Sequence, residues 1–99
     1  MVVMYIAAGY IEFDTSDCGT LKERRSVINS IINKTLAKFS RISINEVGNS
    51  EAIDRAVIGV TAVSNDKKIA ESILSKVLMY IENESFRTVL KMESDVFTL

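Results

Sequence analysis

Hydrophobic positions along the chain follow two different periods, and each change of period marks the boundary of a predicted element. Stretches rich in β-branched and aromatic residues, or alternating between apolar and polar residues, predict strands. Stretches with apolar residues three and four positions apart predict helices. The predicted elements are a strand over 2–13, a helix over 21–39, strands over 42–47 and 55–63, a helix that follows Asp66 and ends near Ser85, and a strand over 87–97.

Both predicted helices begin with capping residues. Thr20 and Glu23 have the spacing of a capping box, in which the hydroxyl accepts an amide proton and the carboxylate reaches back to the start of the helix. The run Ser64–Asp66 supplies N-cap candidates for the second helix. Along the first helix, Lys34 and Lys38 lie off the apolar stripe and are expected to face solvent.

The element order is β-α-β-β-α-β, and this order predicts the fold. Two right-handed crossovers of helix length give a four-stranded antiparallel sheet with both helices on one face, the ferredoxin-like split arrangement of the α+β class. The strand over 55–63 is almost continuously apolar, which indicates a central place in the sheet. The whole chain, residues 1–99, is expected to form one domain.

Composition removes several classes of function. The chain has 99 residues, of which 47% are hydrophobic and 25% charged, and its formal net charge is -1. It contains no histidine and a single cysteine, Cys18, so we expect no disulfide, no histidine-cysteine metal centre and no cofactor. The apolar segment 1–11 lacks a basic flank and is far shorter than the ~20 residues that span a bilayer, so we expect no membrane association and a cytoplasmic location.

Three segments resemble signatures of a known family. Gly19–Val27, then Glu46–Gly48 followed by Asp54–Val60, and finally Val63–Asp66 are similar in sequence and order to those of the YlxP-like family. The resemblance extends over about residues 1–85. It implies a small bacterial protein of unknown function with a ferredoxin-like fold, of a kind often encoded near genes for translation and ribosome maturation.

Three cations near the start of the first helix form the main candidate binding site. Lys22, Arg24 and Arg25 lie where positive charge opposes the helix macrodipole, and the free amide groups of a helix start also favour an anion. We therefore predict an anion or RNA phosphate as their partner. The alternative is that the two arginines pair with nearby carboxylates and only solvate the surface.

A second pair of charges flanks a turn. Glu46 and Arg55 are predicted to face each other across a hairpin as a structural charge pair that fixes the strand register. Gly48 between them is predicted to adopt a positive φ angle.

Other candidate chemistry has less support. Asp14 and Asp17 have no further carboxylate cluster nearby, so we expect no metal site. Cys18 has no histidine to activate it as a nucleophile. Tyr5 and Tyr10 have no aromatic counterpart on the strand over 55–63, which argues against base stacking on the sheet.

Both faces of the first strand are apolar, although only one can lie under the helices. The face that remains open is predicted to be an oligomer interface, because large exposed apolar patches usually mark interfaces. The candidate residues on this face are Met4, Ile6, Ala8 and Tyr10. We expect an isologous homodimer.

Two functions follow from these features. The first is an RNA- or ribosome-associated adaptor that uses the basic start of the first helix. The second is a homo-oligomeric interaction or ligand-sensing module built on the open sheet face. We expect no enzymatic activity, because the chain lacks histidine, a paired-carboxylate site and a phosphate-binding loop.

Overall fold

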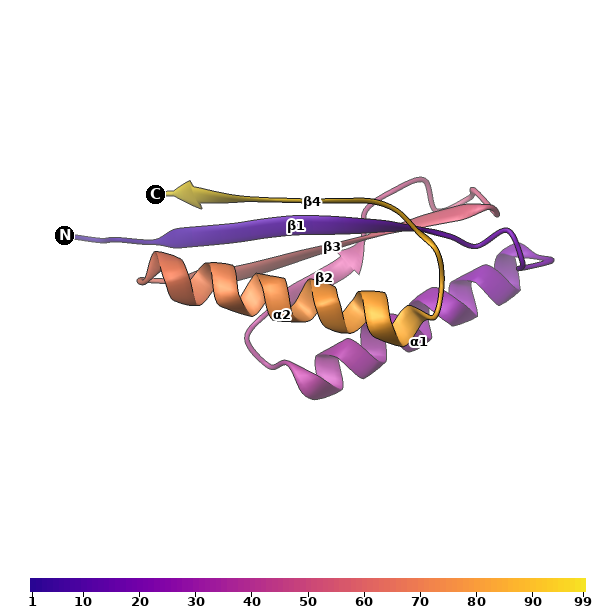
Figure 1. Cartoon of the computed structure of the whole chain (residues 1–99), viewed down its shortest axis with the longest axis horizontal. Coiled ribbons are helices and arrows are strands. Elements are labelled where there is room, and N and C mark those ends of the chain that lie inside the picture. The colour runs from indigo at the N-terminus through magenta and orange to yellow at the C-terminus, as the bar shows by residue number, and fades with distance from the viewer.

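The computed structural model describes residues 1–99 and confirms the predicted ferredoxin-like fold (Figure 1). The elements are β1 (Tyr5–Asp14), α1 (Leu21–Lys38), β2 (Ser43–Glu46), β3 (Arg55–Ser64), α2 (Lys67–Ser85) and β4 (Val89–Thr98). Their order is β-α-β-β-α-β, as the hydrophobic pattern predicts.

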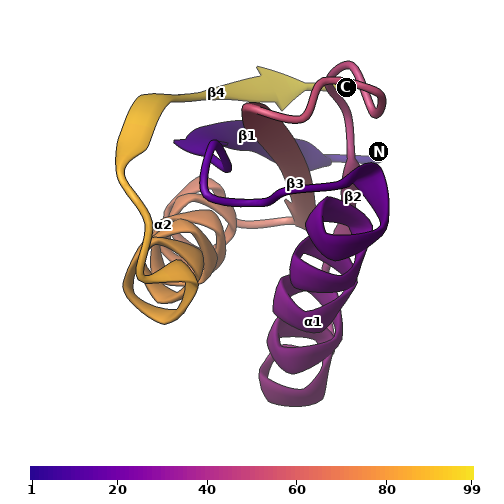
Figure 2. The ribbon, with the colours of Figure 1, turned by 90° about the vertical axis from the view of Figure 1, so that its right-hand side faces the viewer.

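The four strands form one antiparallel sheet in the order β2-β3-β1-β4. The two central strands, β1 and β3, pair along their whole length, from Tyr5 opposite Ser64 to Asp14 opposite Arg55. Both helices lie on the same side of the sheet, which leaves its other face without a covering layer (Figure 2). The register between β1 and β4 shifts at Phe13, where β4 bulges.

The strands differ from their predicted bounds mostly at their ends. The first strand begins at Tyr5, three residues later than its apolar composition predicts. Its two neighbours explain this difference, because Tyr5 is already paired with Ser64 on one side and Thr98 on the other. Residues before it therefore have little sheet to join.

The core lies between the helices and the covered face of the sheet. Alternate residues of β1, including Ala7, Ile11 and Phe13, are fully buried there. Burying an isoleucine or phenylalanine side chain contributes about 1.5–3 kcal/mol. The buried cluster comprises Ala7, Ile11, Phe13, Ile28, Ile31, Ala56, Ile58, Val60, Ala70, Leu74, Val77, Leu78 and Ile81.

A side-chain cap and a left-handed residue mark the two ends of α2. Asp66 caps α2 and accepts hydrogen bonds from the amides of Lys68 and Ile69, as the sequence predicts. The helix ends at Ser85, and its C-cap, Phe86, is the one residue with a positive φ, at 52°. Neither helix combines the length and the apolar character that a membrane crossing requires.

Candidate functional site

The first turn of α1 is held by the predicted capping box. The hydroxyl of Thr20 accepts a hydrogen bond from the amide of Glu23 at 3.1 Å. The Glu23 carboxylate in return accepts from the amide of Gly19 at 2.9 Å, one residue before the cap. The helix start is therefore satisfied by its own residues.

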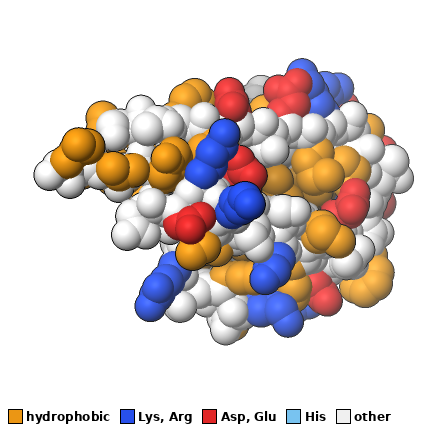
Figure 3. All heavy atoms as spheres, turned by 60° about the vertical axis from the view of Figure 1, so that its left-hand side comes forward, with side chains coloured by type: hydrophobic (Ala, Val, Ile, Leu, Met, Phe, Trp, Pro, Cys, Tyr) orange, Lys and Arg blue, Asp and Glu red, His pale blue; other side chains and the backbone are white.

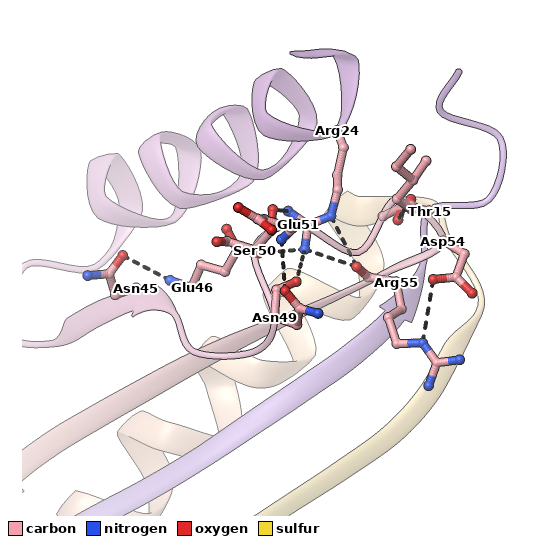
Figure 4. Close-up of polar contacts among 10 residues, drawn as sticks. Thr15, Arg24, Asn45, Glu46, Asn49, Ser50, Glu51, Asp54 and Arg55 are labelled. Carbon is pink, nitrogen blue, oxygen red and sulfur yellow. Dashed lines mark hydrogen bonds and ion pairs between the residues drawn. The ribbon is translucent and has the colours of Figure 1, made fainter. Parts of the chain in front are cut away.

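Arg24 does not belong to an anion-binding surface, which corrects the sequence prediction. Its side chain is 0% exposed and points inward from the second turn of α1 (Figure 4). It donates to the Glu46 carboxylate at 2.6 Å, and the other acceptors of its guanidinium are backbone carbonyls of Asn49, Ser50 and Arg55. The planar fork of donors on arginine suits this arrangement.

Glu46 and Arg55 do not form the predicted pair. Glu46 lies opposite Ile58 in the β2–β3 ladder, and its carboxylate pairs with Arg24 on the helix side of the sheet. The Arg55 side chain lies instead near Asp54, with Nε 3.6 Å from a carboxylate oxygen. Arg55 contributes to the charged cluster through its backbone carbonyl alone.

Gly48 also differs from its prediction, since no glycine has a positive φ. The position needs glycine because of close packing, as an added Cβ would lie 2.8 Å from Cγ2 of Val57.

A signal for the burial of Arg24 was present in the sequence. The buried positions of α1 are Arg24, Ile28, Ile31 and Thr35, spaced three and four residues apart. Arg24 therefore falls on the buried stripe, while its neighbour Arg25 does not. The charge of Arg24 concealed this periodicity, because an arginine is seldom fully buried without partners.

Lys22 and Arg25 are exposed, and further exposed cations follow along α1, with Lys34 and Lys38 on the flank toward α2, where Lys38 lies over the Tyr80 ring. We call the surface that these cations form the basic face and define it by Lys22, Arg25, Lys34, Lys38 and Arg41. None of these five side chains lies within ion-pair distance of a carboxylate. Lysine and arginine side chains are visible on the lower, helical side of the molecule in Figure 3.

The loop after β1 carries a separate charged contact. Arg87, just after α2, donates to the carboxylate of Asp17 and to the backbone carbonyl of Asp14. Hydrogen bonding from Arg87 lowers the pKa of Asp17, and hydrogen bonding from Ser16 lowers the pKa of Asp14. Asp14 and Asp17 do not belong to a cluster of side chains that could hold a metal ion. Cys18, which lies between these aspartates and α1 in the sequence, is buried.

On the open sheet face, Ile6, Ala8 and Tyr10 project away from the helices, as alternation along β1 predicts. The Tyr10 hydroxyl donates to Glu93 at 2.8 Å, and Lys91 lies 3.5 Å from the same glutamate. The hydrogen bond from Tyr10 is the main reason that the pKa of Glu93 is lowered.

Comparisons with known proteins agree with the resemblance in the sequence. A family described as "Protein of unknown function (DUF503)" matches residues 6–94. The Uncharacterized protein YlxP of Bacillus subtilis (strain 168) is 35% identical over 79 residues, which cover 78% of this chain and 85% of that protein.

One solved structure with little sequence identity shares the fold, and a second gives a lower score. The de novo designed protein Ferredog-Diesel is 12% identical with a TM-score of 0.53, over 91% of this chain and 83% of its own. The de novo designed protein Foldit4 is 14% identical with a TM-score of 0.49, over 97% of this chain and 96% of its own. The family match and the YlxP relative cover most of the chain, and the protein therefore belongs to the DUF503 family, whose function is unknown.

Proposed function

We propose that the protein is an RNA-binding adaptor that contacts phosphates through the basic face of α1. The observation that carries this proposal is the set of five exposed cations on and just after one helix, none of them paired with a carboxylate. The only acidic residue of α1 is Glu23, whose carboxylate is used in the cap.

The fold does not need these cations. Lys22 and Arg25 lie in the first two turns, where each exposed positive charge costs about 0.3–1 kcal/mol against the helix macrodipole. An anionic partner would offset this cost, because its negative charge lies next to the cations. Neutralising phosphates would also release their condensed counterions, which favours binding. Asn29 and Asn33 are also exposed between the cations and add side-chain amide donors to the same surface.

The distribution of charge favours an approach from the side of α1. The net charge of the chain is -1, so a polyanion is attracted by a local surface and not by the molecule as a whole. The open sheet face carries carboxylates of Glu12, Glu93 and Asp95, which repel phosphates. Gly59 and Thr61 stand on β3 at the positions opposite Tyr10 and Ala8, so the two central strands offer no aromatic pair for base stacking.

A binding role fits the residues better than catalysis does. The one buried arginine, Arg24, is fully engaged in structural hydrogen bonds. The resemblance in the sequence implies that members of this family are often encoded near translation genes. We therefore propose ribosomal RNA as the target. The adaptor would then associate with ribosomal subunits through the basic face.

Co-sedimentation with ribosomal subunits at low and high salt tests this function. The wild type is compared with Lys22→Ala/Arg25→Ala, which removes two charges from the basic face. The matched control is Lys68→Ala/Lys76→Ala, which removes two exposed and unpaired charges from α2.

We expect the wild type and the α2 control to sediment with subunits at low salt and to be released at high salt. The α1 variant should remain in the supernatant at both salt concentrations. Equal binding by all three proteins, or no binding by the wild type, contradicts the proposal.

A further inference from the structure

Phe86, the residue that follows α2, exposes an aromatic ring to solvent in a left-handed backbone conformation. It is 88% exposed, the most of any aromatic residue in the chain, and its φ and ψ angles are 52° and 33°. Glycine is the usual residue at such a helix end, because a Cβ crowds the backbone there. An exposed ring on a strained backbone is unfavourable for folding in two ways, and such outliers gather at functional sites.

The backbone that carries this ring is fixed on both sides. The hydroxyl of Ser85 donates to the carbonyl of Glu82 at 3.1 Å and accepts from the amide of Arg87 at 3.4 Å. The Arg87 side chain in turn donates to the backbone carbonyl of Asp14, at the end of β1, and to the carboxylate of Asp17. The ring therefore projects from an ordered position, which lowers the entropy lost when it binds a partner.

The neighbours of this ring in the chain line a groove between α1 and the end of α2, two helices that lie side by side in Figure 2. The groove consists of two adjoining hollows of about 470 Å³ and 310 Å³ that share Ser26, Val27 and Arg87. Lys22 lines the first hollow and Lys34 the second. With a rise of about 1.5 Å per residue, the two lysines lie about 18 Å apart along α1, so a strand of several nucleotides is needed to contact both.

The charges in this groove favour phosphates on the side of α1 and an uncharged group at the end of α2. Lys22 and Lys34 have no carboxylate within ion-pair distance. Among the carboxylates that line the groove, Asp17 is paired with an arginine and Glu23 accepts a hydrogen bond in the helix cap. Glu84 on α2 is unpaired and repels phosphates, so a nucleobase suits this end of the groove better.

We propose that Phe86 stacks on a base of single-stranded RNA whose phosphates bind Lys22 and Lys34 in this groove. The inference rests on the proposed function, since both lysines belong to the basic face. A ring stacks only on a base whose face is free, and the bases of a duplex already cover one another. Stacking on an aromatic side chain accepts any base, so the site selects unpaired RNA and not a particular sequence.

The composition of the chain provides a spectroscopic test. The chain contains no tryptophan, so Phe86→Trp places a single indole at the proposed stacking position. Single-stranded oligoadenylate should quench its fluorescence, because a base stacks on the indole. Inorganic polyphosphate offers negative charge without bases, so it should bind the basic face and leave the fluorescence unchanged. Oligoadenylate annealed to its complement should also leave it unchanged.

Affinity measurements with Phe86→Leu test the contribution of the ring. This variant keeps an apolar side chain without a ring, so its dissociation constant for oligoadenylate should rise about fivefold or more, and that for polyphosphate should not change. Phe97→Leu is the matched control, because Phe97 is 53% exposed on β4 and should affect neither ligand.

Phe86→Gly separates binding from a structural role. Glycine adopts the left-handed conformation without strain, so this variant should unfold at a higher temperature than the wild type while it binds oligoadenylate more weakly. A ring that served the fold would instead lower the unfolding temperature when removed, and that result overturns the proposal.

The outcomes also separate stacking from the binding of RNA by the basic face. If Phe86→Leu binds oligoadenylate as tightly as the wild type does, stacking is overturned and RNA binding by the basic face stands. Equal quenching of Phe86→Trp by polyphosphate and oligoadenylate overturns stacking as well. A wild type that binds no oligoadenylate overturns both stacking and the proposed function.

Discussion

The guanidinium of Arg24 on α1 donates a 2.6 Å hydrogen bond to the carboxylate of Glu46 at the end of β2. The same guanidinium binds the backbone carbonyls of Asn49 and Ser50, in the segment that connects β2 to β3, and of Arg55 at the start of β3. No buried side-chain polar atom is left without a partner. This contact ties the first helix to the β2–β3 connection, a segment with little regular structure of its own.

Replacing Arg24 should therefore affect stability and not binding. In Arg24→Ala, Glu46 and three carbonyls lose their donor, and removing one partner of a buried ion pair typically costs about 3–5 kcal/mol. Chemical denaturation measures the loss. Arg24→Lys should recover less than half of it, because an ammonium lacks the planar fork. The control, Arg25→Ala, is exposed and should change stability by less than about 0.5 kcal/mol. Equal effects at both arginines would contradict the structural role.

Gly9 lies on the covered face of β1, at a position that leaves no room for a side chain. An added Cβ would stand 2.9 Å from the carbonyl oxygen of Glu93 and 3.1 Å from Cδ1 of Leu78. Because one of these neighbours is backbone, Gly9→Ala should destabilise the protein by about 1–3 kcal/mol. Gly19→Ala is the control, since its nearest neighbour would be 3.6 Å away. Thermal unfolding of both variants measures this loss. A Gly9→Ala variant as stable as the wild type would contradict the close approach of Glu93 and Leu78.

The pKa of Glu93 reports the contact with Tyr10. Their hydrogen bond stabilises the carboxylate and lowers its pKa below that of a free glutamate. Tyr10→Phe removes the donor, so the pKa of Glu93 should rise toward the value of a free glutamate. NMR titration of the side-chain carboxyl measures this shift, and Tyr5→Phe serves as the control.

The sign of the associated stability follows from linkage. A carboxyl group whose pKa is lower in the folded state stabilises the fold above its unfolded pKa, and this contribution is lost as the pH falls through the folded pKa. The Tyr10→Phe substitution should thus weaken the protein near neutral pH and have less effect below about pH 4. A difference that grows on acidification would contradict this assignment.

The fold follows from local signals in the sequence. The period of the apolar residues, the capping box at Thr20 and the cap at Asp66 are all set by near neighbours, and the structure contains each of them. An open apolar face was also predictable, because successive residues such as Ile6 and Ala7 point to opposite faces of the strand and both faces are apolar. The register of β1 against β3 then decides which of these residues face solvent.

The partners of charged side chains were not predictable in the same way. Arg24 and Glu46 are 22 residues apart, and their contact depends on how α1 packs over β2. Proximity in sequence suggested Arg55 as the partner of Glu46, but the two side chains lie apart. The exposure of Arg25 and the burial of Arg24 could be told apart only from the buried stripe of α1.

The salt dependence of RNA binding tests the proposed role of the basic face most directly. Fluorescence anisotropy with a labelled RNA oligonucleotide gives the slope of log K against log salt concentration. Removing two phosphate contacts in Lys22→Ala/Arg25→Ala should make this slope shallower by about 1.4–1.8, while Lys68→Ala/Lys76→Ala should leave it unchanged. Identical slopes for the wild type and the α1 variant, or an equal change in the α2 control, would contradict RNA binding by the basic face.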